Sequence, residues 1–420
     1  MAKERTYMCF DLKSFYASVE CVARGLDPFE SCLVVADPDR GERSICLAVS
    51  PAMKALGVPG RCRVYELPPN IDYIMAPPRM QEYINVSARI YGVYLRYVAA
   101  EDIHVYSIDE VFMDVTDYMA PRGLDAVGFA RSVMRDVLET TGITATCGIG
   151  PNLYLAKIAL DIISKHSPEF IGILTEESYR ETLWDYQPLT DFWRVSRGTV
   201  ARLSHLGIRS MRDICQTEER LLYKCFGVDA QLLIDHAWGR ESAGIADIKA
   251  YTPSTHSLST GQVLHEGYDI PGARLLILEM AELLSLDLVA QGMAASTVDI
   301  SLCYSYSLDR KPAHGSIRLD APSSSTKTLL RYTAALYDRI AVTDEPVYRV
   351  NISFGSLTAE DGQQCDMFTD ASAQEKEKRL QETMIDIKRK YGKNGIFKAM
   401  NLLDGAKTLE RNRQIGGHKA

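Results

Sequence analysis

The sequence lacks the features that would place the chain in a membrane or in an oxidising compartment. It has no uninterrupted apolar run of about 18 residues, the length that a membrane-spanning helix needs. The first five residues (MAKER) do not resemble the apolar core of a signal peptide. The ten cysteines are scattered, without a C-x-x-C pair or a Cys/His ligand spacing, which argues against a zinc site and a disulfide framework. We therefore expect a cytoplasmic protein that does not contact a membrane.

An excess of positive charge is also missing. The chain has 47 Lys and Arg residues against 55 Asp and Glu residues, for a net charge of −8. Proteins that bind nucleic acid are usually basic, so the total alone argues against such a partner. The distribution of charge can override the total, however, and basic residues accumulate near the C-terminus. They are Lys388, Arg389, Lys390, Lys393, Lys398, Lys407, Arg411 and Arg413.

No internal repeat or low-complexity tract is present, and 420 residues are too many for one hydrophobic core. Residues 5–165 alternate strand and helix patterns around a central hairpin at 103–116, which predicts an α+β sheet with helices on one face. Residues 166–240 are typical of short helices with little strand signal. A separate small α/β domain is expected from residue 252. Its strands are predicted at 256–264, 297–306, 314–320 and 346–354, and its helices at 272–291 and 325–341, before a helix at 374–391.

Two adjacent carboxylates, Asp109 and Glu110, stand between apolar, β-prone flanks. Neighbouring side chains on a strand point to opposite faces, so the two acids can share a site only at a strand end or a tight bend. Asp11 ends an N-terminal apolar run and would reach the same site if the two strands are neighbours. Three convergent carboxylates suit a hard ion such as Mg²⁺, which predicts a metal-dependent phosphoryl-transfer site. For each acid alone, the alternative is a solvated turn residue.

Three segments resemble the motifs of the Y-family, or translesion, DNA polymerases, in the family's order. Residues 11–20 (DLKSFYASVE) resemble the first motif, residues 107–114 (SIDEVFMD) the second and residues 148–159 (GIGPNLYLAKIA) the third. Residues 54–58 and 411–418 are most similar to the UmuC subclass of Gram-positive bacteria and their mobile elements.

The resemblance implies an α+β multidomain protein shaped as a right hand. The implied parts are a palm at 1–29 and 66–165, fingers at 30–65, a helical thumb at 166–240, an α/β little finger at 246–357 and a C-terminal tail at 358–420. The implied activity is template-directed, low-fidelity DNA synthesis across lesions in the SOS response to DNA damage. A dNMP would be joined to the primer 3′-hydroxyl with release of pyrophosphate.

The same resemblance assigns the metal and nucleotide sites. Asp11, Asp109 and Glu110, with the Leu12 carbonyl, would hold two Mg²⁺ ions, or Mn²⁺ in their place. Phe15 and Tyr16 would begin the first palm helix, with the Tyr16 ring under the dNTP sugar, where a 2′-hydroxyl would clash. The alternative for these rings is a core aromatic pair. Cations for the triphosphate are expected at Lys54, Lys157 and Lys165, although Lys165 is offset by one residue and Pro51 replaces the family's fingers tyrosine.

Primer–template DNA is the macromolecular partner that the resemblance implies. Residues 192–203 resemble the thumb's helix-hairpin-helix, but Arg194 and Ser196 stand where relatives carry glycine. Arg194 and Arg197 would then replace backbone contacts to phosphate. In the little finger, small polar residues on one strand predict further backbone contacts, with a solvated sheet face as the alternative. These residues are Ser257, Ser259 and Thr260, followed by Gln262.

Residues 364–368 (QCDMF) resemble the pentapeptide that docks bacterial polymerases on the sliding clamp. Gln364 would form hydrogen bonds, and Met367 and Phe368 would fill an apolar pocket, with Asp366 between them. Two other interpretations are a catalytically inactive, clamp-binding scaffold and a palm-fold nucleotide cyclase. The intact acids argue against the scaffold, and the thumb and clamp motifs argue against the cyclase. The sequence leaves open whether a UmuD-like protein and a recombinase filament are required.

Overall fold

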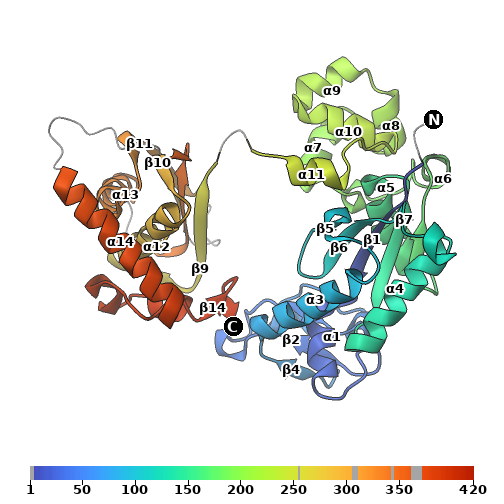
Figure 1. Ribbon diagram of the computed structural model, residues 1–420, viewed down its shortest axis with the longest axis horizontal. Helices are drawn as coiled ribbons and strands as arrows, with labels where there is room; N and C mark the ends of the chain where they lie inside the picture. Colours follow the sequence, from blue (N-terminus) through green and yellow to red (C-terminus); the bar gives the residue numbers. More distant parts are fainter. Residues whose placement is uncertain (1–3, 254–255, 305–310, 342–344, 361–370) are drawn as a thin grey trace. The chain divides into compact units, whose positions relative to one another are not determined.

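A computed structural model describes residues 4–253, 256–304, 311–341, 345–360 and 371–420. The chain divides into two compact units, Met1–Tyr251 and Thr252–Ala420, which are described separately below (Figure 1). This division agrees with the new domain that the sequence predicts from residue 252.

A five-stranded sheet with the order β5-β6-β1-β7-β8 forms the centre of the first unit. The central strand β1 is antiparallel to β6 on one side and to β7 on the other, and β8 is parallel to β7. The predicted hairpin is thus confirmed as β5 and β6. The strands are β1 (Tyr7–Leu12), β5 (Ile103–Val105), β6 (Glu110–Asp114), β7 (Ala145–Gly150) and β8 (Ile171–Ile173).

Helices cover both faces of this sheet, whereas the sequence pattern predicts one covered face. Phe10 of β1 packs against Tyr94 of α3, with ring centroids 5.8 Å apart. Cys9, which points to the opposite face, packs with residues of α5. Gly148 permits this second layer, because a Cβ there would lie 2.1 Å from the Ala156 carbonyl oxygen. The helices are α1 (Phe15–Val22), α3 (Met80–Tyr94), α4 (Ala126–Thr141) and α5 (Leu153–Ile158), and Gly142 ends α4 in the left-handed conformation.

In a smaller three-stranded sheet, ordered β3-β2-β4, the strands β2 and β3 lie within residues 30–65, for which fingers are predicted. Its core includes Val34, Cys46 and Met53, all fully buried. Strand β4 is parallel to β2, so residues 74–76 belong with this sheet and not with the large one. The elements are β2 (Leu33–Val35), β3 (Ala48–Val49), α2 (Pro51–Ala55) and β4 (Ile74–Ala76).

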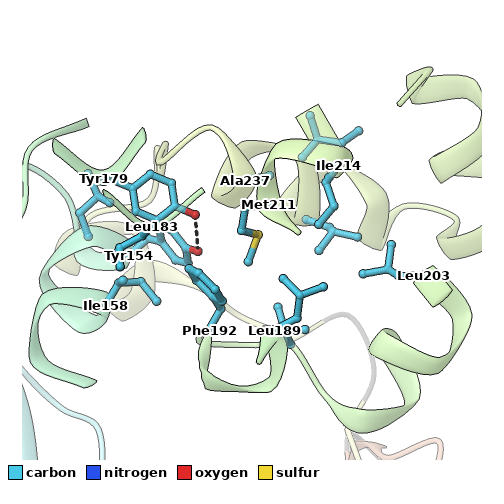
Figure 2. Close-up of a cluster of buried hydrophobic side chains, with 14 of the residues drawn as sticks. Tyr154, Ile158, Tyr179, Leu183, Leu189, Phe192, Leu203, Met211, Ile214 and Ala237 are labelled. Atoms are coloured by element: carbon cyan, nitrogen blue, oxygen red, sulfur yellow. Dashed lines mark hydrogen bonds between the residues drawn. The ribbon is translucent and has the colours of Figure 1, made fainter. Parts of the chain in front are cut away.

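The helical part of the first unit has its own core, which Figure 2 shows. Tyr154 and Tyr179 lie side by side in this core, and their hydroxyl oxygens are 3.2 Å apart. Strand β8 falls within the segment 166–240, although the sequence shows little strand signal there. The helices are α6 (Glu176–Thr182), α7 (Arg197–His205), α8 (Met211–Gln216), α9 (Glu219–Phe226), α10 (Asp229–Ala237) and α11 (Ile245–Ala250).

The second unit contains a five-stranded antiparallel sheet, ordered β11-β10-β12-β9 with the short β13 paired to β10, and α12 and α13 pack against one face of it. The four predicted strands and both helices lie close to their predicted positions, and β9, β10 and β11 are longer than predicted. The elements are β9 (Leu258–Tyr268), α12 (Ile270–Ala290), β10 (Met293–Tyr304), β11 (Ala313–Ser323), α13 (Thr326–Ile340), β12 (Val347–Gly355) and β13 (Thr358–Ala359).

The C-terminal residues fold back onto α12 of the same unit. Helix α14 (Ala371–Tyr391) precedes the short helix α15 (Thr408–Arg411) and a small hairpin of β14 (Gln414–Ile415) and β15 (His418–Lys419). The fully buried carboxylate of Glu279 on α12 accepts hydrogen bonds from the backbone N–H groups of Lys407 and Thr408, at 2.8 and 3.1 Å. It also accepts one from the side chain of Asn401, at 3.1 Å. An anion here stabilises the N-terminal end of α15.

Of the helices in the part that the structure describes, none combines the length and the apolar character needed to cross a membrane. The nine cysteines among the described residues all have free thiols.

Candidate active site

Two of the three predicted acids lie on neighbouring strands, and the third, Asp109, directly precedes one of them. The antiparallel register of β1 and β6 places Asp11 directly opposite Glu110. The Leu12 backbone N–H donates to the Asp109 carbonyl oxygen at 3.0 Å. Side chains of directly opposed residues share one face of a sheet, so Asp11 and Glu110 project to the same side. The predicted adjacency of the two strands is confirmed.

A tight bend brings Asp109 into position beside these two residues. Asp109 precedes the first residue of β6, and the Glu110 carbonyl oxygen accepts hydrogen bonds from the N–H groups of Tyr106 and Ser107, at 3.0 and 3.1 Å. The Ser107 hydroxyl lies 2.6 Å from an Asp109 carboxylate oxygen. This hydrogen bond limits the rotation of the Asp109 side chain, so the bend orients an acid that a continuous strand would turn away.

Asp11 is a partly buried acid that lies within range of two like charges. Burial raises the pKa of Asp11 to about 7, and the nearby Asp109 and Glu110 carboxylates raise it further against the opposing effect of Lys157 and Lys165. Among the described residues, no three His, Cys, Asp or Glu side chains are gathered closely enough to hold a metal as they stand. The donor set itself fits Mg²⁺, because it consists of carboxylates that repel one another in a partly buried site.

Lys157 occupies the position next to Glu110 on the α5 face. Its ammonium nitrogen lies 2.8 Å from Glu110 Oε1 and 2.8 Å from Asp161 Oδ2, and its side chain is only 9% exposed. Burial lowers the pKa of Lys157, but Asp161, Cys9 and Glu110 raise it by more, so the net pKa is above its usual range. This lysine therefore compensates two carboxylates, and its expected contact with a triphosphate stays a prediction.

Three other lysines converge near Asp11 from separate parts of the chain. Lys13 follows β1, Lys54 lies in α2 and Lys165 lies in a short 3₁₀ turn, Ser164–His166. Burial lowers the pKa of Lys13, and repulsion by Lys54 and Lys165 lowers it further. Burial and repulsion by Lys165 also lower the pKa of Lys54, while Asp11 raises it. Mutually repelling cations beside an acid suit a polyanion such as a triphosphate. The sequence reasoning missed Lys13, which stands inside the first motif.

Pro51 begins helix α2 and so has a structural reason to be there. Ser50 is the N-cap residue, whose hydroxyl accepts a hydrogen bond from the Met53 N–H at 3.3 Å. Proline is favoured at the first helical position because its ring fixes φ and no N–H is needed there. Lys54 lies three residues later, close to the charges described above.

Phe15 and Tyr16 begin α1, as the resemblance implies. Phe15 is buried, whereas Tyr16 is partly exposed. Burial and the charge of Asp109 raise the pKa of the Tyr16 hydroxyl, while Arg61 lowers it. Tyr16 is thus within electrostatic range of both the acidic bend and the fingers. The turn before α1 holds Ser14 at φ +49°, a conformation that non-glycine residues rarely adopt.

The thumb segment contacts the acidic hairpin through aromatic residues. The Trp193 indole N–H donates to the Tyr106 hydroxyl at 3.1 Å, and the Trp193 ring also packs against Phe112. Arg194 adopts φ +66°, the left-handed conformation that favours glycine, and its guanidinium stacks on Trp193. Arg197 begins α7, where the Ser196 hydroxyl accepts a hydrogen bond from the Thr199 N–H. The backbone turn that the motif predicts is present without its glycine.

The predicted little-finger residues divide between the two faces of the sheet. Ser257 precedes β9. Ser259 lies opposite Ser353 on the uncovered face, where Ser259 and Ser353 line an open hollow. Thr260 is in register with Ile352, whose side chain is buried under the helices. Thr260 and Gln262 therefore point to the covered face, and the prediction of one polar face that includes Thr260 is wrong, since side chains alternate. The clamp peptide residues Gln364, Asp366, Met367 and Phe368 lie outside the described residues.

Comparison with protein families adds a direct match. Residues 10–161 match the model of the impB/mucB/samB family, and residues 255–367 match the model of that family's C-terminal domain. The first range contains all the predicted metal and nucleotide residues except Lys165.

Similar proteins match along the whole chain. UvrX of Bacillus subtilis (strain 168), named for UV-damage repair, is 28% identical over 418 residues, covering 99% of this chain and 98% of the relative. DNA polymerase IV 2 of the same organism is 28% identical over 430 residues, and the match covers 100% of this chain and 100% of the relative. DNA polymerase IV 2 of Halalkalibacterium halodurans is 26% identical over 425 residues, with 99% of each chain covered.

Solved structures share the fold. The Y-family DNA polymerase chimera Dbh-Dpo4(243-245)-Dbh matches with a TM-score of 0.65 at 20% identity, covering 84% of this chain and 99% of that chain. An insertion ternary complex of Dbh DNA polymerase matches with a TM-score of 0.51 at the same identity and coverage. These matches confirm the predicted α+β multidomain fold.

Proposed function

The chain belongs to the impB/mucB/samB family of Y-family DNA polymerases, and we propose that it performs template-directed, low-fidelity DNA synthesis across damaged bases. The observation that carries the proposal is the meeting of Asp11 and Glu110 across two paired strands, with Asp109 in the adjoining bend. The UV-damage name of the UvrX relative supports a role in the DNA-damage (SOS) response.

The chemistry follows from the residues around the bend. Asp11, Asp109 and Glu110, with the Leu12 carbonyl, would hold two Mg²⁺ ions, for which Mn²⁺ could substitute. When bound, such ions lower the pKa of the primer 3′-hydroxyl and neutralise charge on the triphosphate and pyrophosphate. The chain contributes the positioning: the bend and the Ser107 hydroxyl orient Asp109, and Lys157 compensates the charge of Glu110.

The incoming nucleotide would lie between the acids and the lysine cluster. Lys13, Lys54 and Lys165 are suited to the triphosphate, because they are close enough to repel one another. Tyr16 would stand under the sugar and exclude a 2′-hydroxyl by steric conflict. The dNTP would thus be held by charge at one end and selected by shape at the other.

DNA contacts are proposed in both units. In the first unit, Arg194 and Arg197 would bind backbone phosphates from the turn that precedes α7 and from its first residue. In the second unit, Ser259 lies on the uncovered face of the sheet, and Ser257 directly precedes β9. Their hydroxyl groups would bind the DNA backbone. The net charge of −8 predicts modest intrinsic affinity and appreciable salt sensitivity.

Docking on the bacterial sliding clamp would offset this weak binding. Gln364, Asp366, Met367 and Phe368 supply the pentapeptide, and tethering raises the effective concentration of DNA. Binding of purified clamp should be lost in Phe368→Ala. A UmuD-like protein and a recombinase filament are further partners that the UmuC-like motifs suggest. The free thiols of the described cysteines agree with a cytoplasmic location.

The test is primer extension with Mg²⁺, dNTPs, and intact and abasic templates. The wild type is compared with the double variant Asp109→Ala/Glu110→Ala. Extension that disappears in the double variant supports a metal-dependent polymerase, and the abasic template tests lesion bypass. Absence of wild-type extension, even with clamp and recombinase filament present, would favour the inactive scaffold.

A further inference from the structure

Two helices of the first unit meet through four residues arranged as two facing pairs. Tyr16 and Glu20 are four residues apart on α1, and Arg79 and Tyr83 are four residues apart at the start of α3. Residues at this spacing lie on the same helix face, one turn apart. Each helix therefore presents one aromatic ring and one charge to the other.

Tyr83 contacts both residues of the α1 pair. Its ring stacks on the Tyr16 ring, with centroids 4.4 Å apart and an interplanar angle of 16°. Its hydroxyl donates a hydrogen bond to Glu20 Oε1 at 2.9 Å. Tyr83 is fully buried, whereas Tyr16 is partly exposed. The buried Tyr83 side chain is thus fixed by ring stacking and by its hydrogen bond to Glu20, and the partly exposed Tyr16 ring packs against it.

Glu20 is the fixed end of this arrangement. Its carboxylate is fully buried and accepts hydrogen bonds from Arg79 Nε and Nη2, at 2.9 and 3.0 Å, as well as from Arg24. A buried carboxylate without partners would be very costly, but here two guanidinium groups and a hydroxyl satisfy it. The bidentate geometry of Arg79 leaves Glu20 little freedom to move.

We propose that Tyr83, anchored by Glu20 and Arg79, is the positioning residue that sets how firmly Tyr16 closes the sugar site against ribonucleotides. The inference rests on the proposed polymerase function. A steric barrier discriminates only as far as it resists displacement, because a ring that yields lets the 2′-hydroxyl in. Functional side chains hold their geometry when packing and hydrogen bonds from a surrounding layer lock their rotamers. Tyr83 supplies that packing to a ring that is otherwise partly exposed.

The experiment measures single-nucleotide insertion of each dNTP and its matching rNTP by the full-length protein. Tyr83→Leu removes the ring, and Tyr83→Phe keeps the ring but removes the hydroxyl that Glu20 binds. Tyr94→Phe is the matched control for Tyr83→Phe, because Tyr94 is also a buried tyrosine of α3 but packs against Phe10 and not against Tyr16. Tyr16→Ala serves as the reference for an open site. Thermal unfolding of each variant reports whether it is folded.

We expect Tyr83→Leu to raise kcat/KM for rNTPs and to lower the dNTP-to-rNTP preference by about tenfold, the upper worth of one aromatic pair. The corresponding loss in Tyr83→Phe should be smaller, and Tyr94→Phe should match the wild type. The values for dNTPs should change by less than about threefold, since Tyr83 does not touch the nucleotide in this view. A gain in ribonucleotide insertion is informative because a merely damaged fold cannot produce it.

The outcomes separate this inference from the proposed function. If the wild type inserts no nucleotide, the proposed function fails and the inference fails with it. If Tyr16→Ala admits ribonucleotides while folded Tyr83→Leu keeps the wild-type preference, the inference alone is overturned. If neither variant changes the preference, the assignment of Tyr16 to the sugar site is also wrong.

Discussion

Lys157 and Glu110 form an ion pair that is almost completely removed from solvent, with 2.8 Å between Nζ and Oε1 and side-chain exposures of 9% and 12%. The same ammonium group is 2.8 Å from Asp161 Oδ2. One lysine thus compensates two carboxylates beneath the acidic bend. Such an arrangement is costly to disrupt, because removal of the single cation leaves two partly buried negative charges.

Lys157→Met should therefore destabilise the protein while it preserves the volume of the side chain. We expect a loss of about 3 kcal/mol in the free energy of unfolding, measured by urea denaturation. Lys165→Met is the control, since Lys165 is 3.8 Å from the same Asp161 but is 56% exposed. Its effect should stay within about 0.5 kcal/mol. Equal effects of the two substitutions would contradict the compensating role of Lys157.

Asp11→Asn should stabilise the metal-free protein at alkaline pH. The pKa of Asp11 is about 7 in the folded protein, against 3.8 for an unperturbed aspartate, so its ionisation opposes folding. The raised pKa means that protonated Asp11 contributes to the free energy of unfolding. This contribution is complete below pH 3.8 and is lost as the pH rises to about 7. At pH 8 with EDTA, the substitution should add at most ~4 kcal/mol, and near pH 4 it should add little.

Added Mg²⁺ provides the control for this prediction. It should stabilise the wild type at pH 8, because a bound cation compensates the ionised acids, and it should have much less effect on Asp11→Asn. Thermal unfolding with and without Mg²⁺ measures both effects. A substitution that destabilises the metal-free protein at pH 8 would show that Asp11 has a structural role instead.

Arg194→Gly should separate backbone strain from charge in the thumb. Glycine adopts φ +66° freely, so the substitution should stabilise the protein by about 1 kcal/mol. The lost cation should reduce the slope of log K for DNA binding against log[salt] by about one. Arg194→Ala is the matched comparison: it should lower the salt slope equally without the gain in stability. An unchanged slope in both variants would remove Arg194 from the DNA contacts.

Glu279→Ala should release the C-terminal segment from α12. The carboxylate binds two backbone N–H groups and the Asn401 amide, and alanine leaves all three without this partner. Limited proteolysis with trypsin should then cut faster after Lys398 and Lys407. The exposed Glu382 of α14 provides the control, since Glu382→Ala removes an acid that makes no such contacts. Equal cleavage rates would show that other contacts hold the segment.

The order of elements could be predicted from sequence because it depends on local pattern. The residue pattern predicts the hairpin of β5 and β6 and the two helices, α12 and α13, that pack against the sheet of the second unit. From the sequence, Asp11 reaches the acidic bend only if its strand is a neighbour of the hairpin. The pairing of β1 with β6 shows that it is. Strand β8 was missed, since three residues in parallel pairing carry too little periodicity to distinguish them from a loop.

What the sequence by itself determined is the family, the order of the elements and the acids of the candidate site, because these depend on residues that lie near one another in the chain. Only the tertiary structure decided which distant side chains meet. The convergence of Lys13 with Lys54 and Lys165, and the stacking of Tyr83 on Tyr16, join residues tens of positions apart. Such contacts depend on the packing of one helix or sheet on another, which no local pattern encodes.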